Sequence, residues 1–182
     1  MVAYCPENPR KRRRGRIGLT GRAAPGGTGW TTEVTTACRI TPLSAADRDD
    51  WGGLWRAYLA FYGTERPAEV YEATFARLTD ADRSDMLGWI ARLEGRAVGI
   101  VHAIVHAHCW QTAPITYLQD LFADPAARGR GVGRALIETV YADADAAGRP
   151  NVYWMTQSGN ATARTLYDRI GVATDFMKYT RP

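Results

Sequence analysis

Residues 128–133 read RGRGVG and lie between two segments of different pattern. Before them, residues 115–123 (ITYLQDLFA) form an apolar run typical of a strand, and from Val132 to Val140 apolar residues recur at helical spacing. Glycines let a backbone approach a ligand closely, and a helix N-terminus offers unpaired N–H groups with a partial positive charge. The strand, the glycine-rich turn and the helix together predict a site for a phosphorylated ligand.

Two common phosphate-binding loops do not fit this segment. A dinucleotide fold requires G-x-G-x-x-G after its first strand, whereas Gly129, Gly131 and Gly133 are evenly spaced and follow the fourth expected strand. A nucleoside-triphosphate loop requires a Lys directly after its last glycine, and here Arg134 follows Gly133. The pattern that remains is Arg-x-x-Gly-x-Gly, which begins at Arg128.

The chain after residue 34 alternates between patterns typical of strands and of helices. A hairpin with a tight turn at Glu94-Gly95 comes early, and a single βαβ unit comes late, which predicts an α+β fold with a mixed sheet. Strands are expected at 35–41, 86–93, 97–106, 115–123, 152–155 and 176–179. Helices are expected to begin near Ser44, Pro67, Val132 and Asn160.

Length and composition favour one globular domain. The 182 residues, 46% of them hydrophobic, are enough for a proper core, and no run reaches the roughly 20 apolar residues of a membrane helix. No hydrophobic region follows the basic start of the chain, so a secretory signal is not expected. Cys5, Cys38 and Cys109 match no zinc or redox pattern, and we expect free thiols in the cytoplasm.

The basic charge is concentrated at the start of the chain. Residues 1–33 hold seven Lys or Arg and two acids, whereas the remainder holds sixteen bases and seventeen acids. Residues 1–34 are therefore predicted to be a disordered basic leader, and residues 35–182 the folded domain. Nucleic-acid binding by the domain is not supported by its charge. A nucleic-acid contact through Arg10–Arg16 remains an alternative, beside a solvated tail or codons absent from the mature protein.

Arg128, Gly131 and Gly133 resemble the coenzyme A pyrophosphate loop of the GNAT superfamily of N-acetyltransferases. Residues 117–125 (YLQDLFADP) resemble the fourth strand of that superfamily, and residues 160–167 (NATARTLY) resemble its later helix, which starts at an Asn and carries a Tyr two turns on. Residues 55–62 (WRAYLAFY) and 119–122 (QDLF) resemble the histone/polyamine acetyltransferase branch. The resemblance covers residues 36–182 and implies a mixed, mostly antiparallel sheet flanked by helices, with a late βαβ coenzyme A-binding unit.

The resemblance implies an N-acetyltransferase that uses acetyl-CoA and acts by direct transfer to a primary amine in a ternary complex. The main chain of the loop would hold the pyrophosphate, with the residues Arg128, Gly129, Arg130, Gly131, Val132, Gly133 and Arg134. The pantetheine arm would run along Leu121, Phe122 and Ala123, and one of their N–H groups would steady the oxyanion. Asn160, Ala163 and Tyr167 are further expected cofactor contacts.

Two residues are candidates for proton transfer. Tyr167 stands at the position of the family's usual general acid, and its free pKa near 10 is comparable with that of an alkyl thiol. Its helical spacing with Ala163 and Leu166 also suits a core residue. Asp120 is the nearest acid for the general base, because Gln119 stands where polyamine-acetylating relatives have a Glu and cannot act as a base. A water chain or solvent is the alternative base.

The acceptor pocket is expected between the first two helices and the sheet. Its predicted lining residues are Tyr58, Phe61, Tyr62, Glu65, Gln119, Tyr153 and Trp154, although aromatic residues at helical spacing also suit a core. The acceptor is a small-molecule amine or a lysine side chain, and Gln119 makes a polyamine less suitable. Equal parity would place His102, His106 and His108 on one strand face, but no Cys or carboxylate at ligand spacing supports a metal site.

Two further expectations concern catalysis and assembly. A coenzyme A-binding regulator without catalysis is the alternative to an enzyme. A homodimer joined through the C-terminal strand, residues 176–179, is expected because members of this branch often complete their sheet from a partner subunit.

Overall fold

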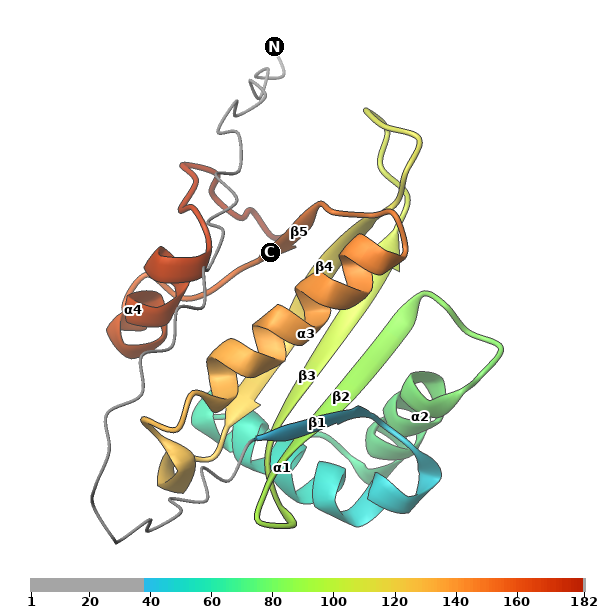
Figure 1. The fold of residues 1–182 in the computed structure, drawn as a ribbon, viewed down its shortest axis with the longest axis vertical. Helices are drawn as coiled ribbons and strands as arrows, with labels where there is room; N and C mark the ends of the chain where they lie inside the picture. The colour runs from blue at the N-terminus through green and yellow to red at the C-terminus, as the bar shows by residue number, and fades with distance from the viewer. Residues whose placement is uncertain (1–37, 182) are drawn as a thin grey trace, which may run out of the picture. The chain divides into compact units, whose positions relative to one another are not determined.

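Five strands form one sheet, in which their spatial order β1-β2-β3-β4-β5 is also their order in the chain (Figure 1). This computed structural model describes residues 38–181. Neighbouring strands from β1 to β4 are antiparallel, and β5 is parallel to β4. The sheet is therefore mixed and mostly antiparallel, which confirms the predicted α+β fold. The strands are β1 (Arg39–Pro42), β2 (Met86–Leu93), β3 (Arg96–His106), β4 (Ile115–Ala123) and β5 (Val152–Trp154).

Helices cover both faces of the sheet. One face is packed against α1 (Arg48–Phe61) and α2 (Ala68–Thr79), and the other against α3 (Val132–Ala146), which makes the crossover from β4 to β5. The last helix, α4 (Ala161–Ile170), packs on the core of the α3 face through Leu166, Tyr167 and Ile170. None of the helices in the described range is long and apolar enough to cross a membrane.

Most of the predicted elements are confirmed. The turn between β2 and β3 lies at Glu94 and Gly95, with φ of 54° and 81°, values that a tight hairpin requires. Asn160 caps α4, since its side chain accepts a hydrogen bond from the backbone N–H of Ala163. The first strand is described only from Arg39 onward. The predicted leader, residues 1–34, lies outside the described residues.

The predicted strand at residues 176–179 is wrong in this structure. Residues 171–181 contain no strand, and the side chains of Phe176 and Tyr179 are 69% and 85% exposed. An isolated apolar run gains little from an extended conformation unless another strand edge supplies its backbone partners. The outer strand β5 has only three residues, so within one chain it offers a short edge for a sixth strand.

The two sheet faces hold different cores. Against α3 the buried residues are mostly aliphatic, with Trp89 among them, and Leu136, Ile137 and Val140 are all 0% exposed. Gly99 allows this close packing, because a Cβ there would lie 2.8 Å from the carbonyl oxygen of Phe122. Against α1 and α2 the core is aromatic, with the Trp51 ring 5.0 Å from both Trp55 and Phe75.

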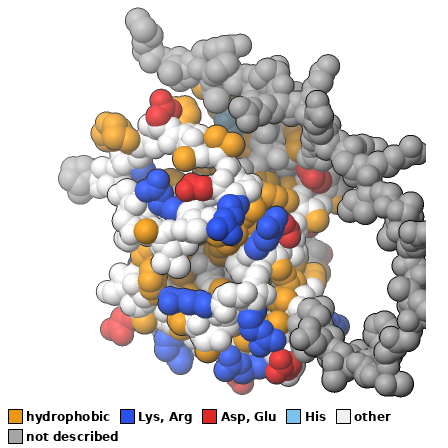
Figure 2. All heavy atoms as spheres, turned by 60° about the vertical axis from the view of Figure 1, so that its left-hand side comes forward, with side chains coloured by type: hydrophobic (Ala, Val, Ile, Leu, Met, Phe, Trp, Pro, Cys, Tyr) orange, Lys and Arg blue, Asp and Glu red, His pale blue; other side chains and the backbone are white. Residues whose placement is uncertain are grey.

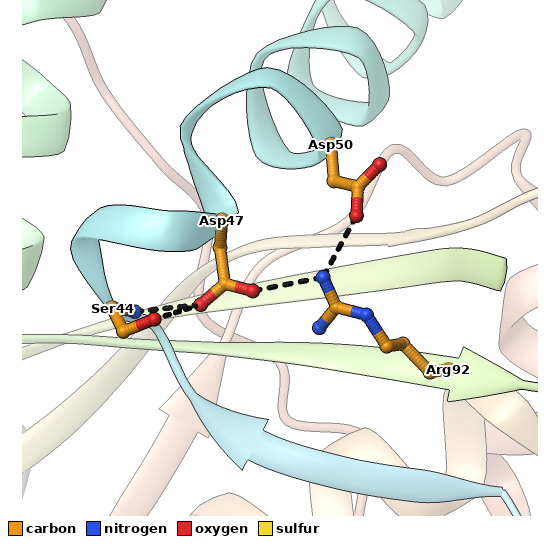
Figure 3. A network of polar contacts seen from close by, with 4 residues as sticks. All are labelled: Ser44, Asp47, Asp50 and Arg92. Atoms are coloured by element: carbon orange, nitrogen blue, oxygen red, sulfur yellow. Dashed lines mark hydrogen bonds and ion pairs between the residues drawn. The ribbon is translucent and has the colours of Figure 1, made fainter. Parts of the chain in front are cut away.

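A polar network fixes the start of α1 on β2 (Figure 3). The backbone N–H and the hydroxyl of Ser44 donate to Asp47 Oδ2 at 2.8 and 2.7 Å. Arg92 Nη2 on β2 donates to Asp47 Oδ1 and to Asp50 Oδ2, both at 2.8 Å. Burial raises the pKa of Asp47, but the Ser44 and Arg92 contacts outweigh it and the net pKa is lowered. The predicted capping start at Ser44–Asp47 is thereby confirmed.

Candidate active site

The RGRGVG turn leads directly into α3. Gly129 and Gly131 both have φ of 76°, a left-handed conformation that strains any residue with a Cβ. Gly131 is the N-cap of α3, so the N–H groups of the first helical turn have no partner within the helix. Arg130 pairs with Glu94 at 3.0 Å and Arg134 with Glu138 at 2.8 Å. The loop can therefore receive an anion mainly through its main chain.

The strand β4 leaves the sheet edge open just before this loop. Pairing with β5 is confined to Thr116, Tyr117 and Leu118. From Gln119 to Ala123 the β5-facing edge of β4 has no strand partner in the described chain. Leu121, Phe122 and Ala123 thus carry main-chain groups along a free edge, whereas the Leu121 and Phe122 side chains pack into the two cores. This is the form of edge along which an extended ligand binds through backbone hydrogen bonds.

A β-bulge turns Asp120 into the molecule. On β3, His102 pairs with Asp120 and Ala103 pairs with Leu118, which leaves Gln119 as the extra residue on β4. Gln119 is exposed, whereas Asp120 is 9% exposed and lies on the face covered by α1. The two neighbours therefore face different environments.

Asp120 belongs to a chain of buried polar side chains. Its Oδ2 lies 2.8 Å from Nδ1 of His102, and Nε2 of His102 lies 2.8 Å from Nε1 of Trp51. Trp51 and His102 are 0% and 4% exposed. Among residues 38–181, no Lys or Arg forms an ion pair with Asp120. The sheet thus holds a buried carboxylate bound by neutral or titratable donors instead of a fixed cation.

Tyr58 on α1 connects Asp120 to the surface. Burial raises the pKa of the Tyr58 phenol, and the charge of Asp120 together with a hydrogen bond to it raises that pKa further. The Tyr58 ring lies 5.1 Å from that of Tyr62 and 6.4 Å from that of Phe122. Tyr58 is therefore a protonated phenol near the Asp120 carboxyl group.

Tyr167 approaches the same region from α4. Burial, with a smaller contribution from Tyr62, raises the pKa of Tyr167 to about 12, so its phenol is protonated at neutral pH. Its ring lies 5.4 Å from that of Trp154. A Cβ at Gly133 would lie 3.4 Å from Leu166, which places α4 against the first turn of α3. The Tyr62 ring, which lies 5.1 Å from that of Tyr58, is thus also close enough to Tyr167 to contribute to its raised pKa.

The other predicted acceptor residues are distributed unevenly. The Tyr153 ring stacks on Tyr117 at 4.9 Å, and its hydroxyl is 3.2 Å from His106 Nε2. Phe61 is 62% exposed, but its ring is 5.1 Å from that of Tyr62. Trp154 contacts Tyr141 and Tyr167 and packs on the core of the α3 face, away from Tyr58. Glu65 and Gln119 are exposed.

Two residues of this region were not predicted as functional from sequence. They are His102, which was considered only as a metal ligand, and Trp51. The sequence pattern does not reveal that a bulge aligns Asp120 with His102. Of the three histidines, His106 ends β3 and His108 lies beyond it, where its ring is 5.7 Å from that of Trp110. The described residues contain no cluster of three or more His, Cys, Asp or Glu suited to a metal ion.

The surface charge on the face drawn in Figure 2 is mixed. Basic side chains there are dispersed among apolar and acidic side chains. The anion site inferred at the loop is therefore a local feature of main-chain geometry.

The chain is similar to known proteins over most of its folded part. The family model described as the acetyltransferase (GNAT) family matches residues 51–172. The D-amino-acid N-acetyltransferase HPA3 of Saccharomyces cerevisiae is 37% identical over 144 residues, which are 78% of this chain and 89% of the yeast protein.

Solved structures agree at the level of the fold. The aminoglycoside acetyltransferase AAC(6')-Iy, bound to a coenzyme A bisubstrate analogue, has a TM-score of 0.71 at 21% identity and covers 80% of this chain and 98% of its own. Ribosomal-protein-alanine N-acetyltransferase of Brucella melitensis biovar Abortus 2308 has a TM-score of 0.67 at 20% identity, with 80% and 99% covered.

Proposed function

Because this chain belongs to the GNAT acetyltransferase family and is an acetyl-CoA-dependent acyltransferase that acts on amines, we propose that it transfers the acetyl group directly to a primary amine in a ternary complex. In this proposal Asp120 is the general base and Tyr167 the general acid. A small-molecule amine is the preferred acceptor, and a protein lysine is the alternative. The main chain of residues 128–134 holds the pyrophosphate, and the free edge of β4 holds the pantetheine.

The buried Asp120 carboxylate carries this proposal. A carboxylate in an aromatic surrounding is costly to bury without a cation, and no Lys or Arg among the described residues pairs with Asp120. An acceptor that arrives as an ammonium brings that cation to the side of Asp120 that Tyr58 reaches. The same carboxylate can then take the proton that blocks nucleophilic attack. Tyr58, Tyr62 and Tyr153 would form the aromatic border of this pocket.

The acceptor nitrogen loses two protons in the proposed reaction. Asp120 takes the first, and its release to solvent is the net proton of the reaction. The nitrogen lone pair attacks the thioester carbon, and the carbonyl electron pair moves to oxygen, where a β4 backbone N–H stabilises the charge. Collapse breaks the C–S bond, and Tyr167 protonates the departing sulfur. The second nitrogen proton restores the Tyr167 phenol.

Cofactor contacts beyond the loop follow from α4. Asn160 fixes the start of this helix, and Ala163 and Tyr167 lie along it. Because α4 rests against the first turn of α3 near Gly133, these residues would border the bound coenzyme at the open edge of β4. We propose Asn160 and Ala163 as contacts that position the coenzyme, with Tyr167 near its sulfur.

An acetylation assay with the purified full chain tests the proposal. Thiol release from acetyl-CoA would be measured with amino acids of both configurations, aminoglycosides, polyamines and lysine peptides; amino acids come first because of the yeast relative. Asp120→Asn should lower kcat about 10²-fold or more, while acetyl-CoA affinity by calorimetry stays near that of the wild type. Asp49→Asn, an exposed carboxylate on α1, is the matched control. Unchanged turnover in Asp120→Asn would exclude Asp120 as the base.

We also propose a homodimer in which residues 172–181 of one subunit join the edge of β5 in the other. The support is the exposed apolar character of that segment: Val172, Phe176, Met177 and Tyr179 are 81%, 69%, 75% and 85% exposed. Light scattering at micromolar concentration should give twice the mass of one chain. A monomer would contradict the proposal.

The proposed catalytic domain is residues 35–182, located in the cytoplasm. Cys38 and Cys109 are free, which suits a reducing compartment. A chain that begins at Thr35 should keep full turnover, and fractionation of the source cells should place the protein with cytoplasmic enzymes. Loss of turnover in the shortened chain would extend the domain into the leader.

A further inference from the structure

The contact with Trp51 determines where the His102 ring carries its proton. An indole N–H can donate a hydrogen bond but cannot accept one. Because Trp51 Nε1 lies 2.8 Å from His102 Nε2, that ring nitrogen must act as the acceptor and carries no proton. The proton of a neutral imidazole then sits on Nδ1, which lies 2.8 Å from Asp120 Oδ2. The geometry therefore selects one tautomer of His102.

This tautomer fixes the position of the Asp120 carboxyl group. A protonated Nδ1 donates to Oδ2 at 2.8 Å, and this contact holds the plane of the carboxyl group. Trp51 comes from α1, His102 from β3 and Asp120 from β4, so three elements fix one carboxylate.

We propose that His102 is a positioning residue for acetyl transfer: held by Trp51 in the tautomer protonated on Nδ1, it orients the ionised Asp120 toward the acceptor amine. The inference rests on the proposed role of Asp120 as base. His102 transfers no proton in the reaction. Its Nδ1–H bond stays intact while Asp120 gains and then releases the proton of the ammonium.

The surroundings of this chain of contacts distinguish it from ordinary packing. Ile90, Ile100 and Phe75 are among the apolar residues that surround it in this core. Well-packed apolar residues of similar volume can match or exceed the stability of a buried polar pair. A buried imidazole and carboxylate at this place are therefore not required by the fold, and they stand beside the open edge of β4.

Two substitutions separate the two hydrogen bonds of His102. The amide nitrogen of Asn takes the place of Nδ1, so His102→Asn keeps a donor to Asp120 and loses the acceptor for Trp51. The amide of Gln reaches the place of Nε2, so His102→Gln keeps the Trp51 contact and loses the donor to Asp120. A misplaced catalytic group costs about 10²-fold in rate. We expect kcat to fall about 10-fold to 10²-fold in His102→Gln and to stay within about 3-fold of wild type in His102→Asn, with the acetyl-CoA KM unchanged in both.

Two controls test whether His102 acts on turnover through Asp120. His108→Gln makes the same substitution at a histidine outside β3 and should leave kcat unchanged. In the Asp120→Asn background, His102→Gln should cause little further loss, because a residue that acts through another has no effect once that partner is changed. Equal losses in the Asn and Gln variants, or a full additional loss in the double variant, would overturn the proposal. Calorimetry with coenzyme A verifies that each variant is folded.

A measurement on the resting protein is independent of turnover. Long-range ¹⁵N–¹H correlation spectra identify which ring nitrogen of a neutral histidine carries the proton. The wild type should show His102 protonated on Nδ1 only, and Trp51→Phe should allow the other tautomer. A wild-type signal with the proton on Nε2 would refute the inference even in an active enzyme. Conversely, absence of acetylation with the expected tautomer would count against the proposed function and leave the assigned state of His102 supported.

Discussion

The two faces of the sheet are built from different chemistry. The α3 face is mostly aliphatic at its centre, where Leu136, Ile137 and Val140 are wholly buried and contact other apolar residues. The α1 face buries Trp51 with an imidazole and a carboxylate, His102 and Asp120, on the strands beneath it. The α3 side also buries a polar contact, in which Arg149 Nη1 donates to Thr116 Oγ1 at 2.7 Å. We propose that the α3 face supports the fold, whereas the α1 face also serves the reaction through Asp120.

The largest effect on stability is expected on the α3 face. Ile137→Ala removes a side chain that is 0% exposed and should lower the free energy of unfolding by about 2–5 kcal/mol. Turnover per folded molecule should change little. Urea denaturation and active-site titration with coenzyme A measure the two quantities. Glu138→Ala, on the exposed side of the same helix, should cost less than about 0.5 kcal/mol. A large loss of kcat in folded Ile137→Ala would contradict the proposal that the α3 face serves only the fold.

Tyr167 combines both roles, because it packs on the core of the α3 face and is also the proposed general acid. Tyr167→Phe should lower kcat about 10²-fold or more and leave coenzyme A affinity nearly unchanged. Because burial raises the pKa of Tyr167 to about 12, the wild-type acid stays protonated through neutral and mildly alkaline pH. The ratio of wild-type to variant kcat should therefore be constant from pH 7 to about 10. Equal turnover would remove Tyr167 from the mechanism.

Asp47 tests the opposite case, a buried polar group on the α1 side that serves only the fold. Asp47→Asn should cost about 1–2 kcal/mol at neutral pH, because the Ser44 and Arg92 contacts weaken. The pKa of Asp47 is lowered in the folded chain, so its stabilisation is present above the unfolded value near 4 and is lost as pH falls through the folded value. Denaturation curves of variant and wild type should therefore converge in acid. A constant difference at all pH values would show that the charge is not involved.

The smallest expected effect lies in the RGRGVG turn. Gly131→Ala places a Cβ where φ is 76°, and the strain should cost about 1 kcal/mol, although nothing lies within 4 Å of that Cβ. Gly133→Ala has no such strain and meets Leu166 at an ordinary 3.4 Å, so it should be neutral or slightly stabilising. Thermal unfolding without ligand compares them. Equal stability of the two variants would show that backbone strain is not what requires Gly131.

Much of the fold follows from local sequence signals. The strand at 115–123 and the hairpin turn at Glu94-Gly95 are set by apolar runs and by a residue pair that accepts positive φ, and both lie where predicted. The start of α4 at Asn160 follows from its capping side chain. The segment 176–179 has a strand-like composition, but strand formation depends on a neighbouring edge, which composition does not report.

The site was harder to predict because it depends on register. Asp120 was recognised as the nearest acid, but its partner His102 lies opposite it only because Gln119 bulges out of β4. No periodicity in either strand marks a bulge in advance. Tyr153 and Trp154 are neighbours in the sequence, yet Tyr153 stacks on Tyr117, whereas Trp154 packs on the core of the α3 face. The conformation of the turn before α3 was easier to predict, because the glycines that permit its positive φ values are visible in the sequence.

The short pairing between β4 and β5 has a consequence for the unliganded enzyme. Within the described chain, strand pairing joins β5 to β4 at only three residue pairs, and α4 follows β5. A coenzyme bound along the open edge of β4 would act as a missing length of strand and bridge the late segment to the rest of the sheet. Amide exchange in β5 and α4 should therefore slow on saturation with coenzyme A far more than exchange in β2 and β3, so the cofactor would serve as a structural component of the domain that uses it.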